Sequence, residues 1–379
     1  MNKIPVGILG ATGMVGQQYI ALLEGHPWFE VRYLAASPRS AGKQYSDAVF
    51  GRWHATGNAA GFSGFSDAVG KLIVQDANDV AKAEAAHKKG DLAFVFSAVA
   101  LSKDETAKLE CDYAAAGIPV VSNNSAHRSD PDVPMLIPEI NAAHTGIIPS
   151  QQKNHGWDKG FIVVKPNCSI QSYMIPVYAL MKAGYAIDKM FITTMQAVSG
   201  AGYPGLSSLD LIDNIIPHLA GEEEKSEKEP LKIFGSIEGG EIVSAKKPVI
   251  SAHCNRVPVV DGHSACVSLQ FATGAGSVGT AKPSLEEIAS IWRNFKSLPQ
   301  ELQLPMAPEH PIILRKEADR PQPRLDRNND KAMAVTVGAL RPCNLFDIRF
   351  TGLSHNTVRG AAGGGILNAE LLKAQGFIN

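Results

Sequence analysis

The amino-acid sequence predicts an α/β protein built from two domains. The first third of the chain alternates strand-like and helix-like segments, which is the pattern of a parallel sheet covered by helices on both faces. After Asn167 the pattern changes to longer strands with alternating apolar residues, which is typical of an α+β domain. The length of 379 residues, of which 45% are hydrophobic, is sufficient for a large core and favours two domains over one.

The first domain is predicted to begin with a short apolar strand at residues 4–9. Residues 14–26 have helical spacing, with an apolar face formed by Val15, Tyr19, Leu22 and Leu23. Further strands are expected at 29–36, 91–99 and 117–123, and a helix at 102–117 lies between the last two. This order of elements indicates a parallel sheet.

The second domain is predicted to contain long strands at residues 189–202 and 263–276. Alternate residues of the second strand are apolar, namely Ala265, Val267, Leu269 and Phe271. Helices are expected at 207–225 and 284–298, and residues 317–332 form a polar, proline-containing loop. The segment 355–376 is Gly-rich and then helical, and we expect it to return to the first domain and cap it.

Composition excludes several classes of protein. The 36 Lys and Arg residues balance 37 Asp and Glu residues without a basic stripe, so no nucleic-acid partner is expected. No uncharged stretch is long enough and unbroken enough to predict a membrane-spanning helix, and the N-terminus has no signal-peptide layout. The five cysteines form no CxxC pair and the histidines have no metal-ligand spacing, so neither a disulfide framework nor a metal site is expected. We therefore predict a cytoplasmic protein with reduced thiols.

A glycine-rich turn joins the first strand to the first helix. Gly10, Gly13 and Gly16 follow the pattern GxxGxxG rather than GxGxxG. Glycines at this place let the backbone approach a pyrophosphate, and the free N–H groups of the helix N-terminus bind its charge. The alternative is a glycine-rich turn without a ligand. The preceding strand and the following amphipathic helix favour the nucleotide site of a Rossmann-type domain.

The end of the second strand distinguishes NADP from NAD. An NAD site usually carries an acidic residue there for the ribose 2′-hydroxyl, but the segment "LAASPRSAGK" has none. Ser37, Arg39 and Ser40 instead offer hydroxyls and a guanidinium, which suit a 2′-phosphate. The alternative is a polar surface loop. We predict NADP as the cofactor.

Cys168 lies in the segment "KPNCSIQS", where a strand is followed by a predicted helix. A cysteine at a helix N-terminus is expected to have a lowered pKa, and the thiolate is the nucleophilic form. Backbone N–H groups nearby, and the Asn167 side chain, would supply donors for a developing oxyanion. The alternative is a buried structural cysteine. Pro176 lies within the predicted helix, so the helix must be short or begin late.

A nucleophilic cysteine requires a proton shuttle, and His263 is the candidate. His263 follows an Asp-Gly turn and opens a strand, but it shares a face with apolar residues and would also fit a core position. His54, His155 and His253 compete for the role on composition alone. Arg256 presents a planar guanidinium that suits a carboxylate, although a surface salt bridge would also explain it.

A series of short motifs then carries a resemblance over essentially the whole chain. In order they are "GILGATGMVGQ", "SPRSAGK", "VSNNSAHR", "PEIN", "KPNCS", "QAVSGAGYPG", "GEEEK", "CNRVPVVDGHS", "DRPQPRLDR" and "HNTVRGAAGG". Together they resemble the archaeal and fungal branch of the aspartate-β-semialdehyde dehydrogenase family. The cysteine motif and the arginine–histidine motif are specific to this chemistry, whereas the glycine turn alone is not.

The resemblance implies roles for individual residues. Cys168 matches the nucleophile, His263 the general acid/base, and Gln196 the glutamine beside the thioester. Arg256 matches the ligand of the substrate's α-carboxylate. In "GEEEK", Glu222 matches a Glu that binds the substrate amino group, and Lys225 matches a Lys that binds phosphate. Glu223 and Glu224 are adjacent to Glu222, so the choice among the three glutamates stays open. The remaining assignments are Arg128 and Asn167 for the substrate and, for the cofactor, Gly10, Thr12, Gly13, Met14, Val15, Gly16, Ser37, Arg39, Ser40, Ser97 and Asn356.

The resemblance also implies a reaction and an assembly. The reaction is the reversible, NADPH-dependent reductive dephosphorylation of L-β-aspartyl phosphate through a Cys168 thioester, in the biosynthesis of lysine, methionine and threonine. The implied NADP-binding domain comprises residues 1–165 with the C-terminal helix 355–379, and the catalytic and dimerisation domain comprises residues 166–354. A homodimer or homotetramer is expected.

Other functions remain open at the level of sequence. A malonyl-CoA reductase would share the cysteine, the histidine and NADPH, but it would not need the amino-group ligand in "GEEEK". N-acetyl-glutamyl-phosphate reductase and glyceraldehyde-phosphate dehydrogenase share the chemistry but match the surrounding motifs less well. A non-catalytic NADP-sensing protein would keep the glycine turn, whereas the presence of Cys168, Gln196, Arg256 and His263 argues against it.

Overall fold

The computed structural model describes residues 3–55, 64–272 and 282–379. The strands are β1 Ile4–Leu9, β2 Phe29–Ala36, β3 Gln75–Asp76, β4 Phe94–Ser97, β5 Val120–Ser122, β6 Ile162–Val164, β7 Ile187–Gln196, β8 Ser236–Glu238, β9 Glu241–Val243, β10 Val249–Arg256, β11 His263–Phe271, β12 Ile312–Leu314, β13 Val335–Pro342 and β14 Ile348–Ser354. The α-helices are α1 Met14–Leu23, α2 Tyr45–Ala48, α3 Asp67–Gly70, α4 Val80–Lys89, α5 Lys103–Ala115, α6 Pro138–Asn141, α7 Ile148–His155, α8 Met174–Lys182, α9 Ser208–Leu211, α10 Glu222–Ile233, α11 Leu285–Asn294, α12 Leu298–Glu301, α13 Pro323–Asp326 and α14 Gly363–Ala374. Shorter helical turns are Ala142–Ile147, Ile170–Ser172, Val198–Ala201 and Val358–Ala362.

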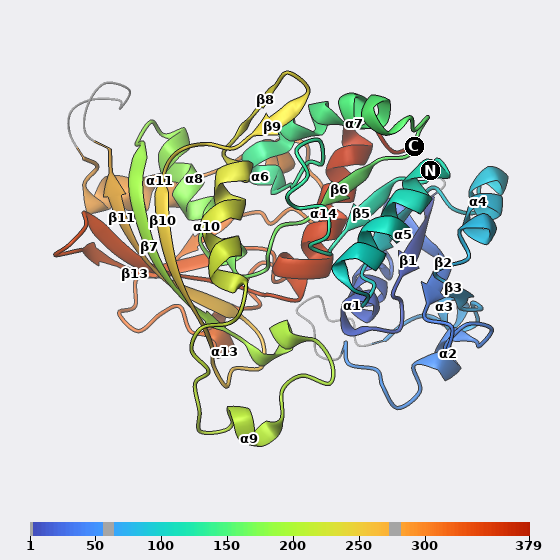
Figure 1. The fold of residues 1–379 in the computed structure, drawn as a ribbon. Helices are drawn as coiled ribbons and strands as arrows, with labels where there is room; N and C mark the ends of the chain where they lie inside the picture. Colours follow the sequence, from blue (N-terminus) through green and yellow to red (C-terminus); the bar gives the residue numbers. More distant parts are fainter. Residues whose placement is uncertain (1–2, 56–63, 273–281) are drawn as a thin grey trace.

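The N-terminal part is a parallel sheet covered on both faces (Figure 1). Its strand order is β3-β2-β1-β4-β5-β6, so the order reverses between β1 and β4. Phe94 and Phe96 of β4 point to the face that α1 and α14 cover, while Val95 and Val120 join the core under α5. This is the doubly wound arrangement that the alternating pattern predicts, and ligands bind such sheets at the point of reversal.

The second part is built on a mixed six-stranded sheet in the order β10-β7-β11-β14-β13-β12. In β11, the four alternate residues predicted to be apolar and internal are all buried, while Cys266 on the other face is exposed. The buried face packs against α8 and α11, where Trp292 donates its indole N–H to the carbonyl of Pro176 at 2.9 Å. The predicted fold class, a Rossmann-type domain with an α+β domain, is confirmed.

The C-terminal segment returns to the first sheet, as the sequence analysis expects. Ile366 and Leu367 of α14 lie in the same hydrophobic cluster as β1 and α1. Arg359, just before α14, is fully buried and binds both carboxylate oxygens of Glu139 at 2.5 and 2.7 Å, and its Nε donates to Gln171. This packing supports the proposed domain limits of 1–165 with 355–379, and 166–354, which stay a prediction.

One predicted helix differs from the structure, and a second begins late, as predicted. Residues 207–225 do not form one helix: α9 ends at Leu211, Asp213 and His218 have positive φ, and Ile216 forms an isolated bridge with Arg256. Pro217 lacks the N–H that a continuous helix needs, and the true helix α10 begins only at Glu222. The helix after Cys168 does begin late, because a 3₁₀ turn at Ile170–Ser172 precedes α8. The part of the predicted strand 263–276 beyond residue 272 lies outside the described residues.

Candidate active site

The glycine turn forms a close-packed cradle at the point where the sheet order reverses. Gly10 has φ of +80°, and a Cβ there would lie 2.3 Å from the carbonyl oxygen of Ala98. A Cβ at Gly16 would lie 2.2 Å from the carbonyl oxygen of Gly10, so only glycine permits this contact. Helix α1 begins directly afterwards without a side-chain cap, which leaves its first N–H groups for an anion. These features fit the diphosphate of a dinucleotide.

The loop after β2 lies at the carboxyl end of the strand next to β1. Ser37 and Arg39 are exposed there, whereas Ser40 is buried and donates its backbone N–H to the carbonyl of Ser37 at 2.9 Å. Exposed hydroxyl and guanidinium groups at this position fit the 2′-phosphate of NADP. Ser97 is buried at the end of β4, and its hydroxyl accepts from Asn124, so it holds the neighbouring loop.

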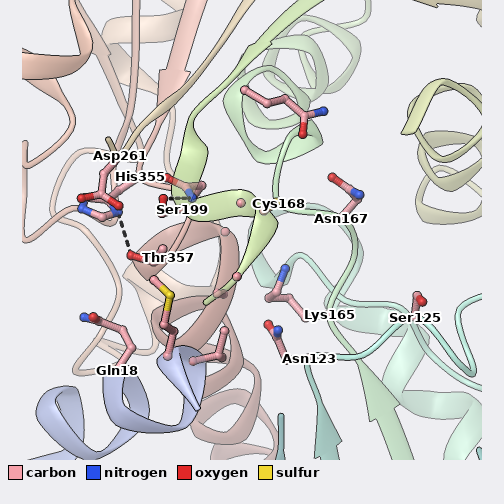
Figure 2. Close-up of a pocket in the computed structure, with 18 of the residues that line it drawn as sticks. Gln18, Asn123, Ser125, Lys165, Asn167, Cys168, Ser199, Asp261, His355 and Thr357 are labelled. Carbon is pink, nitrogen blue, oxygen red and sulfur yellow. Dashed lines mark hydrogen bonds between the residues drawn. The ribbon is translucent and has the colours of Figure 1, made fainter. Parts of the chain in front are cut away.

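A cavity of about 370 Å³ joins this end of the sheet to the second domain (Figure 2). The predicted residues that line it are Met14, Val15, Arg128, Asn167, Cys168, Gln196, Glu222, Lys225, Arg256 and Asn356. His263 lies fully buried behind this wall. The predicted residues Gly10, Thr12, Gly13, Gly16, Ser37, Arg39, Ser40 and Ser97 lie outside the lining of this cavity. Cofactor and substrate residues that are distant in the sequence therefore meet at one opening.

Cys168 and His263 form a hydrogen-bonded pair, with 3.3 Å between Sγ and Nε2. The backbone N–H of Ala197 donates to Nδ1 of the same ring at 2.9 Å. Because an amide N–H can only donate, Nδ1 must accept, and the proton of the neutral ring therefore lies on Nε2, facing the sulfur. Burial, followed by the charge of Arg256, lowers the pKa of His263 to about 3, so this ring is neutral at physiological pH.

The expected lowering of the Cys168 pKa by a helix N-terminus is wrong. Burial raises the pKa of the thiol, and the segment that follows Cys168 is a three-residue 3₁₀ turn rather than an α-helix. A single turn carries too small an aligned dipole to replace the lost hydration of a thiolate. The charges that lower the pKa, led by Lys165 and followed by Arg128 and Arg256, oppose this burial.

Glu222 and Arg256 place opposite charges on the wall of the cavity. Glu222 accepts from Lys225 at 2.8 Å, from Gln196 at 3.1 Å and from the Asn167 amide at 3.0 and 3.2 Å. Burial alone would raise the pKa of Glu222, but these donors lower it, so the carboxylate is charged. The Arg256 guanidinium donates to the carbonyl of Ala197 at 2.8 Å, and its buried Nε has no partner among the described residues.

The polar groups of the Asn167 side chain form hydrogen bonds to other residues of the protein. Its amide nitrogen donates to Glu222, its amide oxygen accepts from the N–H and hydroxyl of Ser169, and its backbone N–H donates to Glu229 at 2.6 Å. These contacts hold the loop that carries Cys168. In this structure Asn167 therefore positions the nucleophile and Glu222, rather than offering a free donor.

The three glutamates of "GEEEK" make different contacts in the structure. Glu222 and Lys225 line the active-site cavity, as the resemblance implies. Glu223 instead accepts from the backbone N–H of Cys254 and pairs with His218 at 3.0 Å. Glu224 lines a neighbouring cavity.

Arg128 supplies a second cation at the opening. Its guanidinium pairs with Glu229 at 2.9 Å and donates to the carbonyl of Asn123 at 3.2 Å, and its Nε has no partner among the described residues. Arg128 lines both the active-site cavity and the neighbouring cavity.

The three histidines that compete with His263 on composition lie in different places. His54 lines the active-site cavity and stacks on Tyr203. His155 pairs with Asp132, and His253 lies on the exposed edge strand β10.

Sequence reasoning missed several residues of the site. Lys165, Glu229 and His355 were assigned no role, although Lys165 and His355 lie inside the quoted motifs "KPNCS" and "HNTVRGAAGG". Burial lowers the pKa of His355 to about 4. The position of Lys165, three residues before the cysteine and directly after β6, was the available signal.

The described residues contain no group of three or more His, Cys, Asp or Glu side chains that would hold a metal ion. All five cysteines are free thiols. Among the described residues, the helices are too short or too polar for any of them to cross a bilayer.

Comparison with known proteins is consistent across the whole chain. Residues 5–147 match the family model "Semialdehyde dehydrogenase, NAD binding domain", and residues 177–359 match "Semialdehyde dehydrogenase, dimerisation domain". The chain is 42% identical to an aspartate-semialdehyde dehydrogenase of Aspergillus fumigatus over 381 residues, covering 99% of each chain. It is 43% identical to that of Archaeoglobus fulgidus over 370 residues, covering 98% of each chain.

A solved structure of aspartate semialdehyde dehydrogenase with NADP from Candida albicans superposes with a TM-score of 0.86 at 37% identity, covering 100% of both chains. The nucleotide cradle, the cysteine–histidine pair and the two matched domains place the chain among the semialdehyde dehydrogenases, which are nicotinamide-dependent oxidoreductases. Within that class, the chain belongs to the aspartate-semialdehyde dehydrogenase family. The resemblance drawn from the motifs is thereby confirmed, as is the prediction of NADP as cofactor.

Proposed function

We propose that this protein catalyses the reversible, NADPH-dependent reductive dephosphorylation of L-β-aspartyl phosphate to L-aspartate-β-semialdehyde. The observation that carries this proposal is the one cavity that brings the Cys168–His263 pair together with a partly buried carboxylate, Glu222, and a buried guanidinium, Arg256. An amino acid carries an ammonium and a carboxylate, which are complementary to the charges of Glu222 and Arg256. Malonyl-CoA has no ammonium for Glu222 to bind.

NADP binds across the glycine cradle in this proposal. The N–H groups at the start of α1 hold the diphosphate, and Ser37 and Arg39 hold the 2′-phosphate. Asn356 stands between the two domains, since it donates to Ser199 and accepts from the backbone N–H of Gly262, both at 2.8 Å. When bound, the cofactor supplies the hydride that reduces the acyl carbon.

Cys168 holds the acyl group as a thioester after phosphate has left and before the acyl carbon is reduced. Its thiolate attacks the acyl carbon of β-aspartyl phosphate, a C–S bond forms, and the C–O bond to phosphate breaks. Arg128 and Lys225 neutralise the charge of the departing phosphate, because both line the cavity and Lys225 remains 37% exposed. The thioester that remains is electrophilic enough to accept a hydride.

His263 acts on the oxygen of the reduced acyl carbon. Its Nε2 carries the proton and faces Cys168 Sγ, so the Nε2–H is placed to donate a hydrogen bond to the oxyanion of the tetrahedral adduct on that sulfur. As the C–S bond breaks, the oxyanion becomes the carbonyl of the aldehyde, the electron pair returns to sulfur as the thiolate, and the ring keeps its proton. Gln196, buried at the end of β7, lines the cavity beside this pair and holds Glu222 in place.

We also infer a homodimer or homotetramer located in the cytoplasm, acting in lysine, methionine and threonine biosynthesis. The segment around α9 projects from the body of the protein (Figure 1). It exposes the apolar side chains of Tyr203, Leu209, Ile212 and Ile215. A cluster of this kind is typical of a protein interface, and the match to a dimerisation domain supports a second copy as its partner.

The activity is tested by mixing the protein with L-aspartate-β-semialdehyde, phosphate and NADP and following NADPH absorbance. Phosphate-dependent formation of NADPH that is lost in Cys168→Ala is expected. Failure of the wild-type protein to turn over this substrate would refute the proposal. Oxidation of NADPH with malonyl-CoA would then support the reductase alternative, and inactivity with both would support an NADP-sensing role.

A further inference from the structure

A buried histidine that the mechanism above does not use lies in the loop that carries Arg128. His127 is 5% exposed and directly precedes Arg128 in the chain. Asn123 and Ser125 of the same loop, residues 123–130, line the active-site cavity together with Arg128 (Figure 2). His127 itself does not line this cavity. The contacts that hold His127 therefore fix the loop behind the residues that face the substrate.

The His127 ring lies between two carboxylates. Its Nδ1 is 2.7 Å from Oδ2 of Asp130, on the same loop, and its Nε2 is 3.8 Å from Oε2 of Glu110, in α5. The first distance is that of a hydrogen bond, whereas the second is an ion-pair distance too long for a hydrogen bond. Both Nε2 and Oε2 are buried, and neither has a hydrogen-bond partner among the described residues. The interaction between these two atoms is therefore electrostatic.

The two carboxylates determine the protonation state of the ring. His127 lowers the pKa of Asp130, so this carboxylate is charged and can only accept, and Nδ1 must carry a proton. A neutral ring would then turn the lone pair of Nε2 toward the buried carboxylate of Glu110, which is repulsive. Burial opposes the charge of the ring, but Asp130, Cys111 and Glu110 together outweigh burial and raise its pKa to about 10. The ring is therefore an imidazolium at neutral pH.

Glu110 connects this imidazolium to the carboxyl ends of the parallel strands. It is fully buried, and its Oε1 accepts from the hydroxyl of Ser122 at 2.7 Å and from the side-chain amide of Asn124 at 3.0 Å. The same amide donates to the hydroxyl of Ser97, at the end of β4, at 3.1 Å. These donors are all neutral, and among the described residues His127 is the only cation paired with Glu110. A buried carboxylate needs such a counter-charge.

Helix α10 holds the same loop from another direction. Lys232 of this helix is buried, and its ammonium donates to the backbone carbonyls of Arg128 at 2.9 Å and of Asp130 at 2.6 Å. The loop that carries Arg128 therefore has two charged anchors. One is Lys232, and the other is the His127 ring with its carboxylates Asp130 and Glu110.

We propose that His127, held between Asp130 and Glu110, is a positioning residue that sets the affinity of the active site for inorganic phosphate by acting through Arg128. A guanidinium binds a phosphate through directed hydrogen bonds, so a displacement of about 1 Å is enough to weaken the contact severely. The ring fixes the backbone one residue before Arg128. The inference rests on the proposed function, because that function assigns Arg128 to phosphate.

Steady-state oxidation of L-aspartate-β-semialdehyde with phosphate varied tests this role. In His127→Gln the KM for phosphate is expected to rise by about tenfold, because a neutral amide cannot compensate the buried Glu110 and the loop shifts. The KM values for the semialdehyde and for NADP are expected to stay within about twofold of wild type. A general disturbance of the fold would raise all three constants together, and that result would overturn the proposal.

The matched control is His155→Gln. His155 also pairs with an aspartate, Asp132, at 3.3 Å, but its side chain is 41% exposed and it lines neither the active-site cavity nor the neighbouring one. This substitution is expected to leave the KM for phosphate within about twofold of wild type. A KM in His127→Gln that stays within the same margin would overturn the proposal. If His127→Gln does not fold, Asp130→Asn repeats the test, with an expected rise of about threefold.

A double-mutant cycle with Arg128→Met separates a positioning role from an independent one. If His127 acts through Arg128, the variant that carries both His127→Gln and Arg128→Met is expected to have the KM for phosphate of Arg128→Met alone, within about twofold. Effects of the two substitutions that multiply would show that the residues act independently and would refute the inference.

Phosphate binding to the free protein gives the same comparison without turnover. In isothermal titration calorimetry the dissociation constant for inorganic phosphate is expected to rise by about tenfold in His127→Gln and by less than about twofold in His155→Gln. This result stands even if the protein fails to oxidise aspartate semialdehyde. An active wild-type enzyme whose phosphate affinity is unchanged in His127→Gln would refute the inference and leave the proposed function intact.

Discussion

Gly200 is the residue whose substitution should disturb the active site most selectively. It lies in the helical turn Val198–Ala201 and lines the cavity. A Cβ at this position would lie 2.7 Å from a terminal nitrogen of Arg256 and 2.9 and 3.0 Å from two atoms of the His263 ring. Its φ is not in the left-handed region, so alanine is compatible with the backbone and acts only through these contacts.

Neither neighbour can retreat without losing a hydrogen bond. The Arg256 guanidinium is held by the carbonyl of Ala197 at 2.8 Å, and the His263 ring is held by the N–H of the same residue and by Cys168. Overpacking of this kind costs about 1–3 kcal/mol. Because each 1.36 kcal/mol corresponds to a factor of ten, Gly200→Ala is expected to lower kcat/KM by about 5- to 160-fold.

The assay is steady-state NADPH formation with L-aspartate-β-semialdehyde and phosphate, with the affinity for NADP measured separately. Gly146→Ala is the matched control, because a Cβ there would make only an ordinary contact of 3.7 Å with Ile237 and lies outside the active-site cavity. It is expected to leave kcat/KM within about twofold of wild type. Wild-type kcat/KM in Gly200→Ala would refute the claim that Arg256 and His263 must keep their present positions.

Three further predictions concern charge. In Glu222→Gln the KM for the semialdehyde is expected to rise by about 10- to 100-fold with the KM for NADP unchanged, because a charged hydrogen bond to the substrate ammonium is lost; equal effects on both constants would contradict this role. Arg39→Ala should raise the KM for NADP by about tenfold or more and leave the KM for NAD unchanged, whereas a parallel rise for both would remove Arg39 from the 2′-phosphate site. The pKa of His355 is lowered to about 4 in the folded protein, against about 6.5 when unfolded, so the unfolded chain binds more protons between these values and stability falls as pH falls through this window. Urea titrations should show that His355→Gln loses less stability than wild type between pH 6.5 and pH 4, by up to about 1.4 kcal/mol per pH unit, and an identical pH dependence would refute the assignment.

The sequence predicts the first domain well because its signals are local. The glycine turn, the strand before it and the helix after it each follow from neighbouring residues, and the structure places Gly10 and Gly16 in contacts that exclude a side chain. The alternating residues of β11 likewise report one buried face. Such patterns depend on periodicity within one element, which a sequence displays directly.

The segment 207–225 shows where local pattern fails. Leu209, Ile212 and Ile215 have the spacing of a helical face, but in this chain they are exposed and α9 is a single turn. An apolar pattern does not say whether the surface that it meets belongs to the same chain or to a partner. The helix predicted here was therefore wrong, because these apolar side chains meet no core of the same chain in the described residues.

The active site combines predictable and unpredictable parts. Cys168 and His263 were candidates from their local sequence, but a structural cysteine and a core histidine fitted equally, and only the resemblance of the surrounding motifs to a family selected them. The direction of the Cys168 pKa could not be predicted, since it depends on burial and on charges brought by distant elements such as Arg128 and Arg256. Lys165 was visible in the motif, but only the fold shows that its side chain turns into the cavity rather than toward solvent.

The central claim is that Cys168 carries the acyl group as a thioester. Rapid mixing of the enzyme with L-aspartate-β-semialdehyde and NADP in the absence of phosphate tests it directly, because oxidation can then proceed only as far as the acyl-enzyme. We predict a burst of NADPH equal to the number of active sites, with a covalent adduct on the Cys168 peptide, and no burst in Cys168→Ala. Absence of the burst in wild type, or its persistence in Cys168→Ala, would contradict the account.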